Sequence, residues 1–137
     1  MLYMLDTDTS SYIIKRHPLG VLETLQAKAE AGHDLVISSI TYAELMLGAE
    51  RSGNKRKHTK LIGEFCERLD AVQPWDKNAA DYFAKSQALL FAKGTPIGVN
   101  DTMIAGHALS LKAIVVTNNQ RHFSKVPKLK FENWNSR

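Results

Sequence analysis

Short apolar runs alternate with longer segments of helical periodicity along this chain, and this alternation limits the possible folds more than any other feature of the sequence. Strands are expected at residues 2–5, 35–38, 71–73 and 113–116, with an edge strand at 130–134. Helices are expected from a cap at Asp8 to residue 15, at residues 21–31, 40–51, 55–68 and 76–93, and from a cap at Asn100 or Asp101 to residue 111. This order favours an α/β fold in which helices flank a mostly parallel sheet.

The length and charge fit a single domain that spans residues 1–137. The chain has 18 Lys and Arg against 14 Asp and Glu, a net charge of +4. This excess fits a polyanionic partner such as RNA without requiring one. Cys66 is the single cysteine, so the sequence excludes an internal disulfide and fits a reducing cytoplasm. No basic segment precedes the apolar N-terminal residues, and no apolar run approaches the roughly 18 residues of a membrane span.

Polar residues follow several of the expected strands. Ligands of open α/β sheets bind beyond the carboxyl ends of the strands. Asp6 directly follows the first strand, and Thr117 and Asn119 follow the strand at residues 113–116. Glu44 lies in the second turn of a helix that follows a strand, and Asp101 opens a later helix. These positions can face one crevice.

Most of these residues also have a purely structural interpretation. Asp101, beside Asn100, is equally suited to cap a helix, which stabilises by about 1 kcal/mol. Asp6 can cap the first helix, although Asp8 is better placed to do so. Asn119 can be a turn residue.

Glu44 is harder to explain structurally, because its helix is apolar nearly all round. Such a helix is expected to be buried, and a buried carboxylate is costly unless it is paired or bound to a metal. An all-oxygen set of Asp6, Glu44 and Asp101 favours Mg²⁺ or Mn²⁺, and no histidine or cysteine spacing matches a zinc site. Such a cluster suits phosphodiester hydrolysis, since the cation neutralises the phosphate and activates water.

The expected helix that begins near Asp101 contains two further informative residues. Gly106 lies mid-helix, where glycine costs about 1 kcal/mol relative to alanine, so it indicates close packing on a neighbour. His107 lies about two turns from Asp101 on the same helix. We interpret His107 as a packed, hydrogen-bonded histidine rather than a metal ligand.

Four segments resemble the motifs of PIN-domain ribonucleases, in particular the VapC toxin family. They are residues 4–8, 38–45, 96–105 and 115–119, the last joined by Phe123. The resemblance implies an α/β/α sandwich and an Mg²⁺- or Mn²⁺-dependent endoribonuclease. It implies metal-binding acids at Asp6, Glu44 and Asp101.

The resemblance also implies a polar fourth member at Asn119, with Thr7 and Thr117 supporting the site. Two positions depart from the family pattern. Asp8 stands where the first motif usually has asparagine, and it either adds charge to the site or caps the helix; we favour the cap. Asn119 stands where aspartate is common, and an amide binds a cation more weakly. One metal is then held firmly, and a second only with RNA bound.

The family further implies partners. These are a VapB-like antitoxin whose C-terminal segment blocks the site, a second copy of the toxin, and a structured RNA, often tRNA, whose cleavage inhibits translation. DNA is contacted only through the antitoxin. Arg121 and His122, just beyond Asn119, are placed to contact a phosphate. The basic run at residues 51–60 is either an RNA-facing surface or two solvated helix ends.

Two other functions remain open on sequence alone. The segment from Asp6 to Ser10 resembles the start of haloacid-dehalogenase-like phosphatases, with Asp6 as nucleophile and Asp8 as general acid. That interpretation leaves Glu44 and Asp101 unexplained. The domain can also be a non-catalytic module for RNA binding or assembly, although all three acids are present.

Overall fold

The computed structural model describes residues 1–135, and its core is one parallel sheet of five strands. The strand order is β3-β2-β1-β4-β5, and every neighbouring pair is parallel. The strands are β1 (Leu2–Leu5), β2 (Asp34–Ser38), β3 (Ala71–Gln73), β4 (Ile114–Val116) and β5 (Lys130–Glu132). All five expected strands are therefore confirmed, including the edge position of the last.

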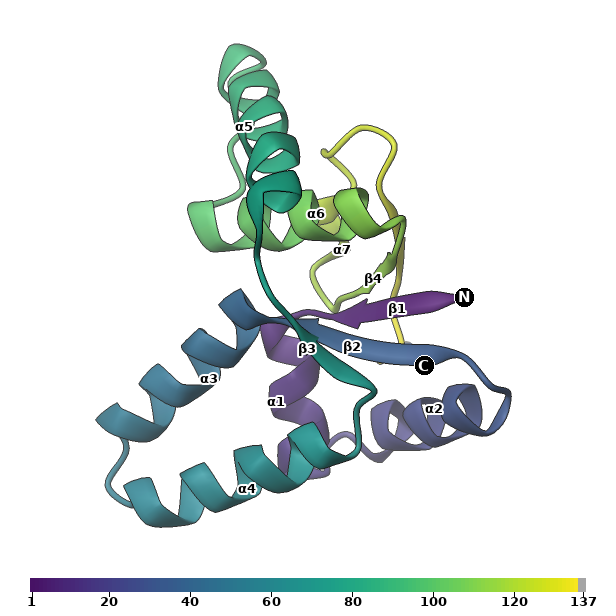
Figure 1. The fold of residues 1–137 in the computed structure, drawn as a ribbon, viewed down its shortest axis with the longest axis vertical. Helices are drawn as coiled ribbons and strands as arrows, with labels where there is room; N and C mark the ends of the chain where they lie inside the picture. Colours follow the sequence, from purple (N-terminus) through teal and green to yellow (C-terminus); the bar gives the residue numbers. More distant parts are fainter. Residues whose placement is uncertain (136–137) are drawn as a thin grey trace.

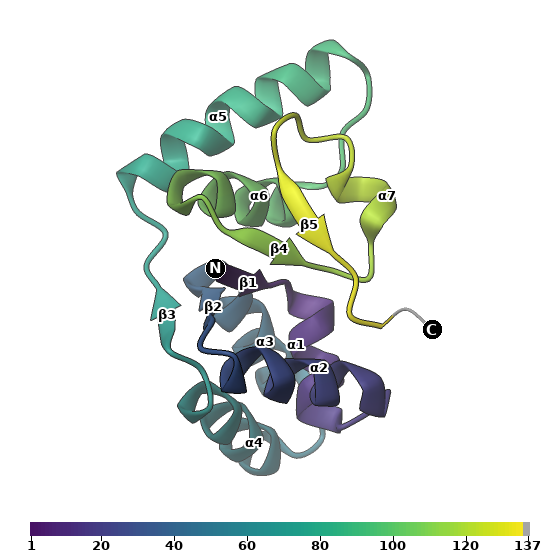
Figure 2. The same cartoon turned by 90° about the vertical axis from the view of Figure 1, so that its right-hand side faces the viewer.

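Helices cover both faces of the sheet, which confirms the expected α/β/α layers (Figures 1 and 2). One face carries α1 (Thr7–Lys15), α2 (Leu19–Glu30), α3 (Ser39–Arg51) and α4 (Lys55–Glu67). The other carries α5 (Lys77–Ala92), α6 (Val99–Leu111) and the short α7 (Gln120–Phe123). The sequence did not predict α7, because a single turn is too short to show periodicity. No helix within residues 1–135 is both long and apolar enough to cross a membrane.

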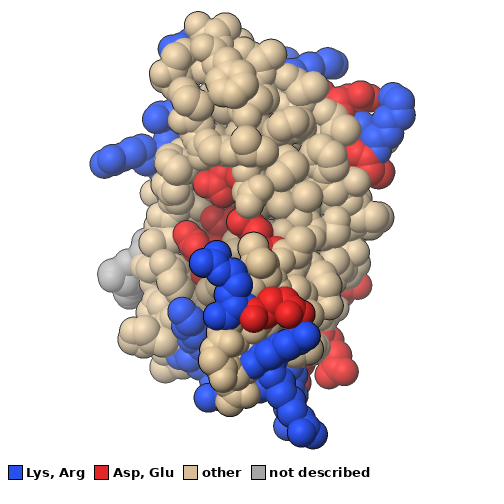
Figure 3. Space-filling view, turned by 90° about the vertical axis from the view of Figure 1, so that its left-hand side faces the viewer, with Lys and Arg blue, Asp and Glu red and all other residues tan. Residues whose placement is uncertain are grey.

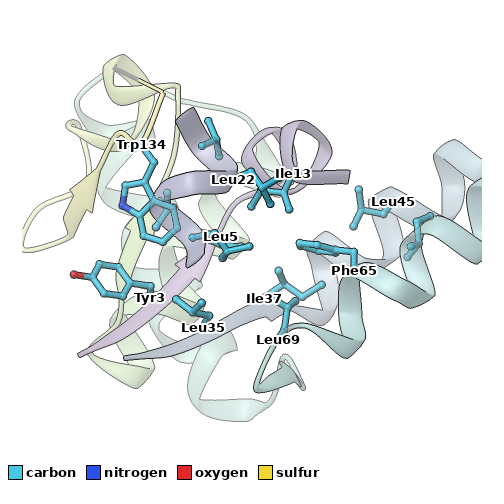
Figure 4. Close-up of a cluster of buried hydrophobic side chains, with 14 of the residues drawn as sticks. Tyr3, Leu5, Ile13, Leu22, Leu35, Ile37, Leu45, Phe65, Leu69 and Trp134 are labelled. Atoms are coloured by element: carbon cyan, nitrogen blue, oxygen red, sulfur yellow. The ribbon is translucent and has the colours of Figure 1, made fainter. Parts of the chain in front are cut away.

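Alternate residues of each strand enter opposite layers of the core, as the pleat of a strand requires. In β1, Leu5 packs with α1, α2 and α4 (Figure 4), whereas Met4 packs with α5 and α6. Both side chains have no exposed surface. Burying a side chain of this size contributes roughly 1.5–3 kcal/mol. The central strand is thus anchored from both sides, and its carboxyl end is held in a defined position.

The helix caps differ from the predictions in two places that matter for the site. Asp6, not Asp8, caps α1, and its Oδ1 accepts a hydrogen bond from the Thr9 backbone N–H at 2.9 Å. The helix begins almost directly after β1, so the single residue between them, Asp6, is the N-cap. At α6 the N-cap is Gly98, with φ of 98°, a conformation that favours glycine. Asp101 therefore lies inside the first turn of α6 and does not cap it.

The structure confirms both predictions for the middle of α6. A Cβ on Gly106 would lie 2.6 Å from the Phe83 backbone nitrogen and 2.7 Å from its Cα, so only glycine allows this approach. His107 is 1% exposed, and its Nδ1 lies 2.8 Å from Ser38 Oγ. That contact ties α6 to the start of α3. Burial lowers the pKa of His107.

Candidate metal centre

The candidate site lies where the strand order reverses. The chain proceeds from β1 outward to β2 and β3, and later returns to place β4 on the other side of β1. In open α/β sheets such a switch point opens a crevice at the carboxyl ends of the strands. Asp6 and Thr117 directly follow β1 and β4 there. The Asp6 N–H donates to the Val116 carbonyl at 3.0 Å, which continues the ladder of the two strands into the site.

Asp6 is a buried carboxylate, 3% exposed. Burial raises its pKa to about 6 from an ordinary 3.8, and the charge of Asp8 adds to the rise. Hydrogen bonds to Thr117 and Thr9 oppose the rise without cancelling it. A cation within a few ångströms of such a carboxylate would stabilise its ionised form.

Glu44 links three helices at the same edge. Its Oε1 accepts a hydrogen bond from the hydroxyl of Thr7 at the start of α1. Its Oε2 accepts from the Asn100 side-chain amide of α6 at 2.9 Å. From the sequence we considered Asn100 only as a possible helix cap. Its place directly before Asp101 was the one signal that could have assigned it to the site.

The reason given for Glu44 from the sequence was wrong, although its location was right. We expected α3 to be buried all round, but Tyr42 is 38% and Leu47 55% exposed. Only the side of α3 that carries Thr41, Leu45 and Ala49 is buried. Glu44 is half-buried at the border between the two sides.

Asp101 projects from the first turn of α6 and contacts the segment after β4. Its Oδ2 lies 3.1 Å from Nδ1 of His122, and the same ring nitrogen lies 2.9 Å from Nδ2 of Asn119. Burial raises the pKa of Asp101, the contact with His122 lowers it, and the charges of Glu44 and Asp8 raise it again. Asp101 therefore lies close enough to Glu44 and to Asp8 for each of them to repel its charge.

Three neighbouring residues named from the sequence, Asp8, Thr117 and Arg121, differ in burial. Asp8 is exposed in the first turn of α1, and our preference for a capping role was wrong because Asp6 is the N-cap. The charge of Asp8 raises the pKa of both Asp6 and Asp101, so it adds to the negative charge of this edge. Thr117 is fully buried, and its Oγ1 accepts from the Asn119 N–H at 2.8 Å, which shapes the turn after β4. Arg121 is exposed on α7.

Carboxylate and amide oxygens dominate this edge, and they are the ligands that Mg²⁺ and Mn²⁺ prefer. Figure 3 shows acidic side chains gathered in a hollow, with lysine and arginine side chains beside it. Within residues 1–135 no three Asp, Glu, His or Cys side chains have already converged into a metal-binding group. In the structure Glu44 is instead held by Thr7 and Asn100, and Asp101 is held by His122. The donor chemistry and the mutual repulsion fit a cation, and these contacts are the ones that would exchange on binding.

Comparison with known proteins gives a consistent match over almost the whole chain. The family model described as PIN domain matches residues 3–129. The tRNA(fMet)-specific endonuclease VapC of Salmonella typhimurium is 39% identical over 132 residues, which cover 96% of this chain and 97% of that protein. Ribonuclease VapC2 of Haemophilus influenzae is 42% identical with the same coverage.

The fold is also found in a solved complex. A crystal structure of VapBC2 from Rickettsia felis, bound to a DNA fragment from the promoter, contains a chain that superposes with a TM-score of 0.92. That chain is 35% identical, and the match covers 98% of this chain and 100% of that one.

Proposed function

This chain belongs to the PIN-domain family, and from that membership we propose that it is a divalent-metal-dependent endoribonuclease that cleaves structured RNA, with tRNA as the first substrate to test. Its relatives over nearly their full length are VapC ribonucleases, so the chain is a nuclease of the VapC type. One observation of the structure carries the proposal. Asp6, which directly follows β1, lies near the switch point of the sheet together with acids on α3 and α6, and burial raises the pKa of Asp6 to about 6.

Asp6, Glu44 and Asp101 are the residues proposed to hold the cation, with Asn119 as a weaker fourth member. When bound, Mg²⁺ or Mn²⁺ supplies charge neutralisation of the phosphate and lowers the pKa of the attacking water. Asp6 serves as a rigid anchor, because the cap to Thr9 and the bond to Val116 fix its backbone and one carboxylate oxygen. Glu44 and Asp101 lie on separate helices, α3 and α6, so their side chains can move toward a cation bound at Asp6.

The side chains around these acids have positioning roles in the proposal. Thr7 and Asn100 orient the two oxygens of Glu44. His122 holds Asp101 and, once released from it, is proposed to donate a hydrogen bond to a phosphate oxygen. Arg121 on the same short helix is exposed toward solvent and is proposed to contact RNA beyond the cleaved bond.

We further propose that this protein acts as a toxin held inactive by a VapB-like antitoxin in the cytoplasm. The support is the similarity to a chain of VapBC2 from Rickettsia felis, a complex bound to promoter DNA. The proposed blocking segment brings a lysine or arginine into the acidic edge, where its charge replaces that of the cation. Contact with DNA is then made through the antitoxin, and the toxin is proposed to be a homodimer whose RNA cleavage inhibits translation.

The two alternatives from the sequence are less well supported. The phosphatase interpretation gives Glu44 and Asp101 no role, although Glu44 is hydrogen-bonded to Thr7, next to Asp6, and its charge raises the pKa of Asp101. A purely non-catalytic module has no need for repelling acids at the switch point, and the relatives are named as nucleases.

The test is cleavage of purified tRNA by the isolated protein, with Mg²⁺, with Mn²⁺ and with EDTA. We expect cleavage with either metal, none with EDTA, and none by Asp101→Asn. Asp34→Asn, which changes an exposed aspartate at the start of β2, is the matched control and should cleave normally. Cleavage that survives EDTA, or an Asp101→Asn variant as active as wild type, would contradict the proposal. Hydrolysis of p-nitrophenyl phosphate without RNA cleavage would favour the phosphatase.

A further inference from the structure

A groove between α1, α3 and α4 leads away from the acidic edge. Its volume is about 590 Å³, within the range of roughly 300–1,000 Å³ for clefts that bind small molecules of drug size. Thr7 and Glu44 of the candidate metal centre line it. Ile14 of α1 and Leu61 of α4 contribute apolar wall. The groove is therefore continuous with the site rather than a separate cavity.

Basic side chains line the same groove. Lys15 comes from the last turn of α1, and Lys57 and His58 come from the first turns of α4. In the part of the chain that the structure describes, neither lysine forms an ion pair, whereas Lys55 is paired with Glu50 at 2.8 Å. Two ammonium groups thus remain uncompensated along a groove that begins at a carboxylate.

A second hollow meets the first at Glu44. Its volume is about 480 Å³, and Glu44, Arg51 and Asn100 are among the residues that line it. Arg51 also forms no ion pair within residues 1–135. Figure 3 shows basic side chains directly beside the acidic hollow on this face. The charge thus changes from negative to positive over a short distance in both directions from Glu44.

We propose that this surface binds the sugar–phosphate backbone of the RNA, with Lys15, Lys57 and Arg51 on phosphates that flank the cleaved one. The inference rests on the proposed function. The acids repel a polyanion, so the free energy of binding must come from cations placed away from them. Thr7 and Lys15 are eight residues apart on α1, about 12 Å along the helix, so Lys15 meets a phosphate beyond the cleaved bond.

The apolar walls narrow the kind of RNA that fits. A paired RNA helix presents mainly phosphates and 2′-hydroxyls, whereas an unpaired loop exposes the apolar faces of its bases. Ile14 and Leu61 offer contact to such faces between the basic residues. The groove therefore suits an unpaired segment of a structured RNA better than a duplex.

The test measures binding of a fluorescein-labelled RNA hairpin with an unpaired loop to the full chain carrying Asp101→Asn, so that the RNA stays intact. Fluorescence anisotropy is recorded from about 50 to 300 mM KCl, where each phosphate contact contributes a slope of about −0.7 to −0.9 in the double-logarithmic plot. Lys15→Ala and Lys57→Ala should each make the slope less steep by the contribution of one phosphate contact, about 0.7 to 0.9. Each should also weaken binding about four- to five-fold at 0.15 M salt.

Controls separate charge from folding. Lys57→Arg should retain the slope, and Lys57→Glu should weaken binding more than Lys57→Ala. Lys93→Ala, at the end of α5 on the opposite face of the sheet, should bind like the parent. A fully paired duplex of the same length should bind more weakly than the hairpin and respond less to these changes. In the active chain, Lys57→Ala should raise KM and leave kcat unchanged.

The outcomes distinguish this inference from the proposed function. If the active chain cleaves RNA but Lys15→Ala and Lys57→Ala show the same salt dependence of binding as the parent, the groove is not the RNA site and the inference is overturned. If the two variants keep the salt dependence of the parent but bind the antitoxin more weakly, the groove binds a polypeptide, and the inference is again overturned. Reduced slopes in a protein that cleaves no RNA would support the groove and contradict the nuclease.

Discussion

Replacing Asp6 with asparagine is expected to stabilise the metal-free protein while abolishing RNA cleavage. Asp6 is 3% exposed, and its pKa is raised from 3.8 to about 6. An acid whose pKa is higher in the folded state contributes most to stability below its unfolded pKa and loses that contribution as the pH rises through the folded value. At neutral pH the ionised carboxylate therefore destabilises the fold.

The size of the effect follows from the shift. At 1.36 kcal/mol per pKa unit, the ionised Asp6 costs about 3 kcal/mol above pH 7. At pH 5 the same linkage gives roughly half of that cost, because most folded molecules then carry the protonated form. Asparagine keeps the oxygen that accepts from the Thr9 N–H, so the cap of α1 is retained. Asp6→Asn should thus exceed wild type by about 3 kcal/mol above pH 7, a rise of about 10 °C in Tm.

The measurement is urea unfolding in EDTA, followed by circular dichroism at several pH values from about 5 to 8. Asp34→Asn, at an exposed position, is the control and should match wild type throughout. Added Mg²⁺ should stabilise wild type more than Asp6→Asn, since the variant lacks one proposed ligand. An Asp6→Asn variant no more stable than wild type in EDTA at pH 7.5, or a difference independent of pH, would refute the electrostatic reasoning.

Three further predictions address the helix contact, the buried histidine and the fourth position. Gly106→Ala should destabilise by about 1–3 kcal/mol in urea unfolding, because its Cβ would overlap the Phe83 backbone, whereas Gly63→Ala, with open space on α4, should be neutral or stabilising by up to about 1 kcal/mol. The pKa of His107 is lowered by burial, so wild type loses stability as the pH falls below about 6.5; the destabilisation caused by His107→Gln at pH 7 should therefore shrink at pH 5, and a constant difference would argue against a neutral buried ring. Asn119→Asp should tighten Mg²⁺ or Mn²⁺ binding in calorimetry, because a carboxylate attracts the cation more strongly than an amide, and unchanged affinity would place residue 119 outside the metal shell.

The sequence by itself determined the order of the strands and of the longer helices along the chain, and the edge of the sheet that carries the acids. Apolar periodicity is a local property, and parallel strands bring their carboxyl ends to one side whatever surrounds them. Asp6 and Thr117 could therefore be assigned to one crevice from their positions after β1 and β4. Gly106 was also readable in advance, since glycine in a helix is costly without a close neighbour.

Tertiary structure alone decided which groups each acid contacts. Thr7 and Glu44 are 37 residues apart, and His122 and Asp101 are 21 apart, so no local pattern pairs them. The capping role passed to Asp6 and Gly98 because the exact start of a helix depends on how the preceding segment packs. The groove beside Glu44 exists only because α1 packs beside the consecutive helices α3 and α4, which lie more than 20 residues later in the chain, and side chains from all three helices set its charge.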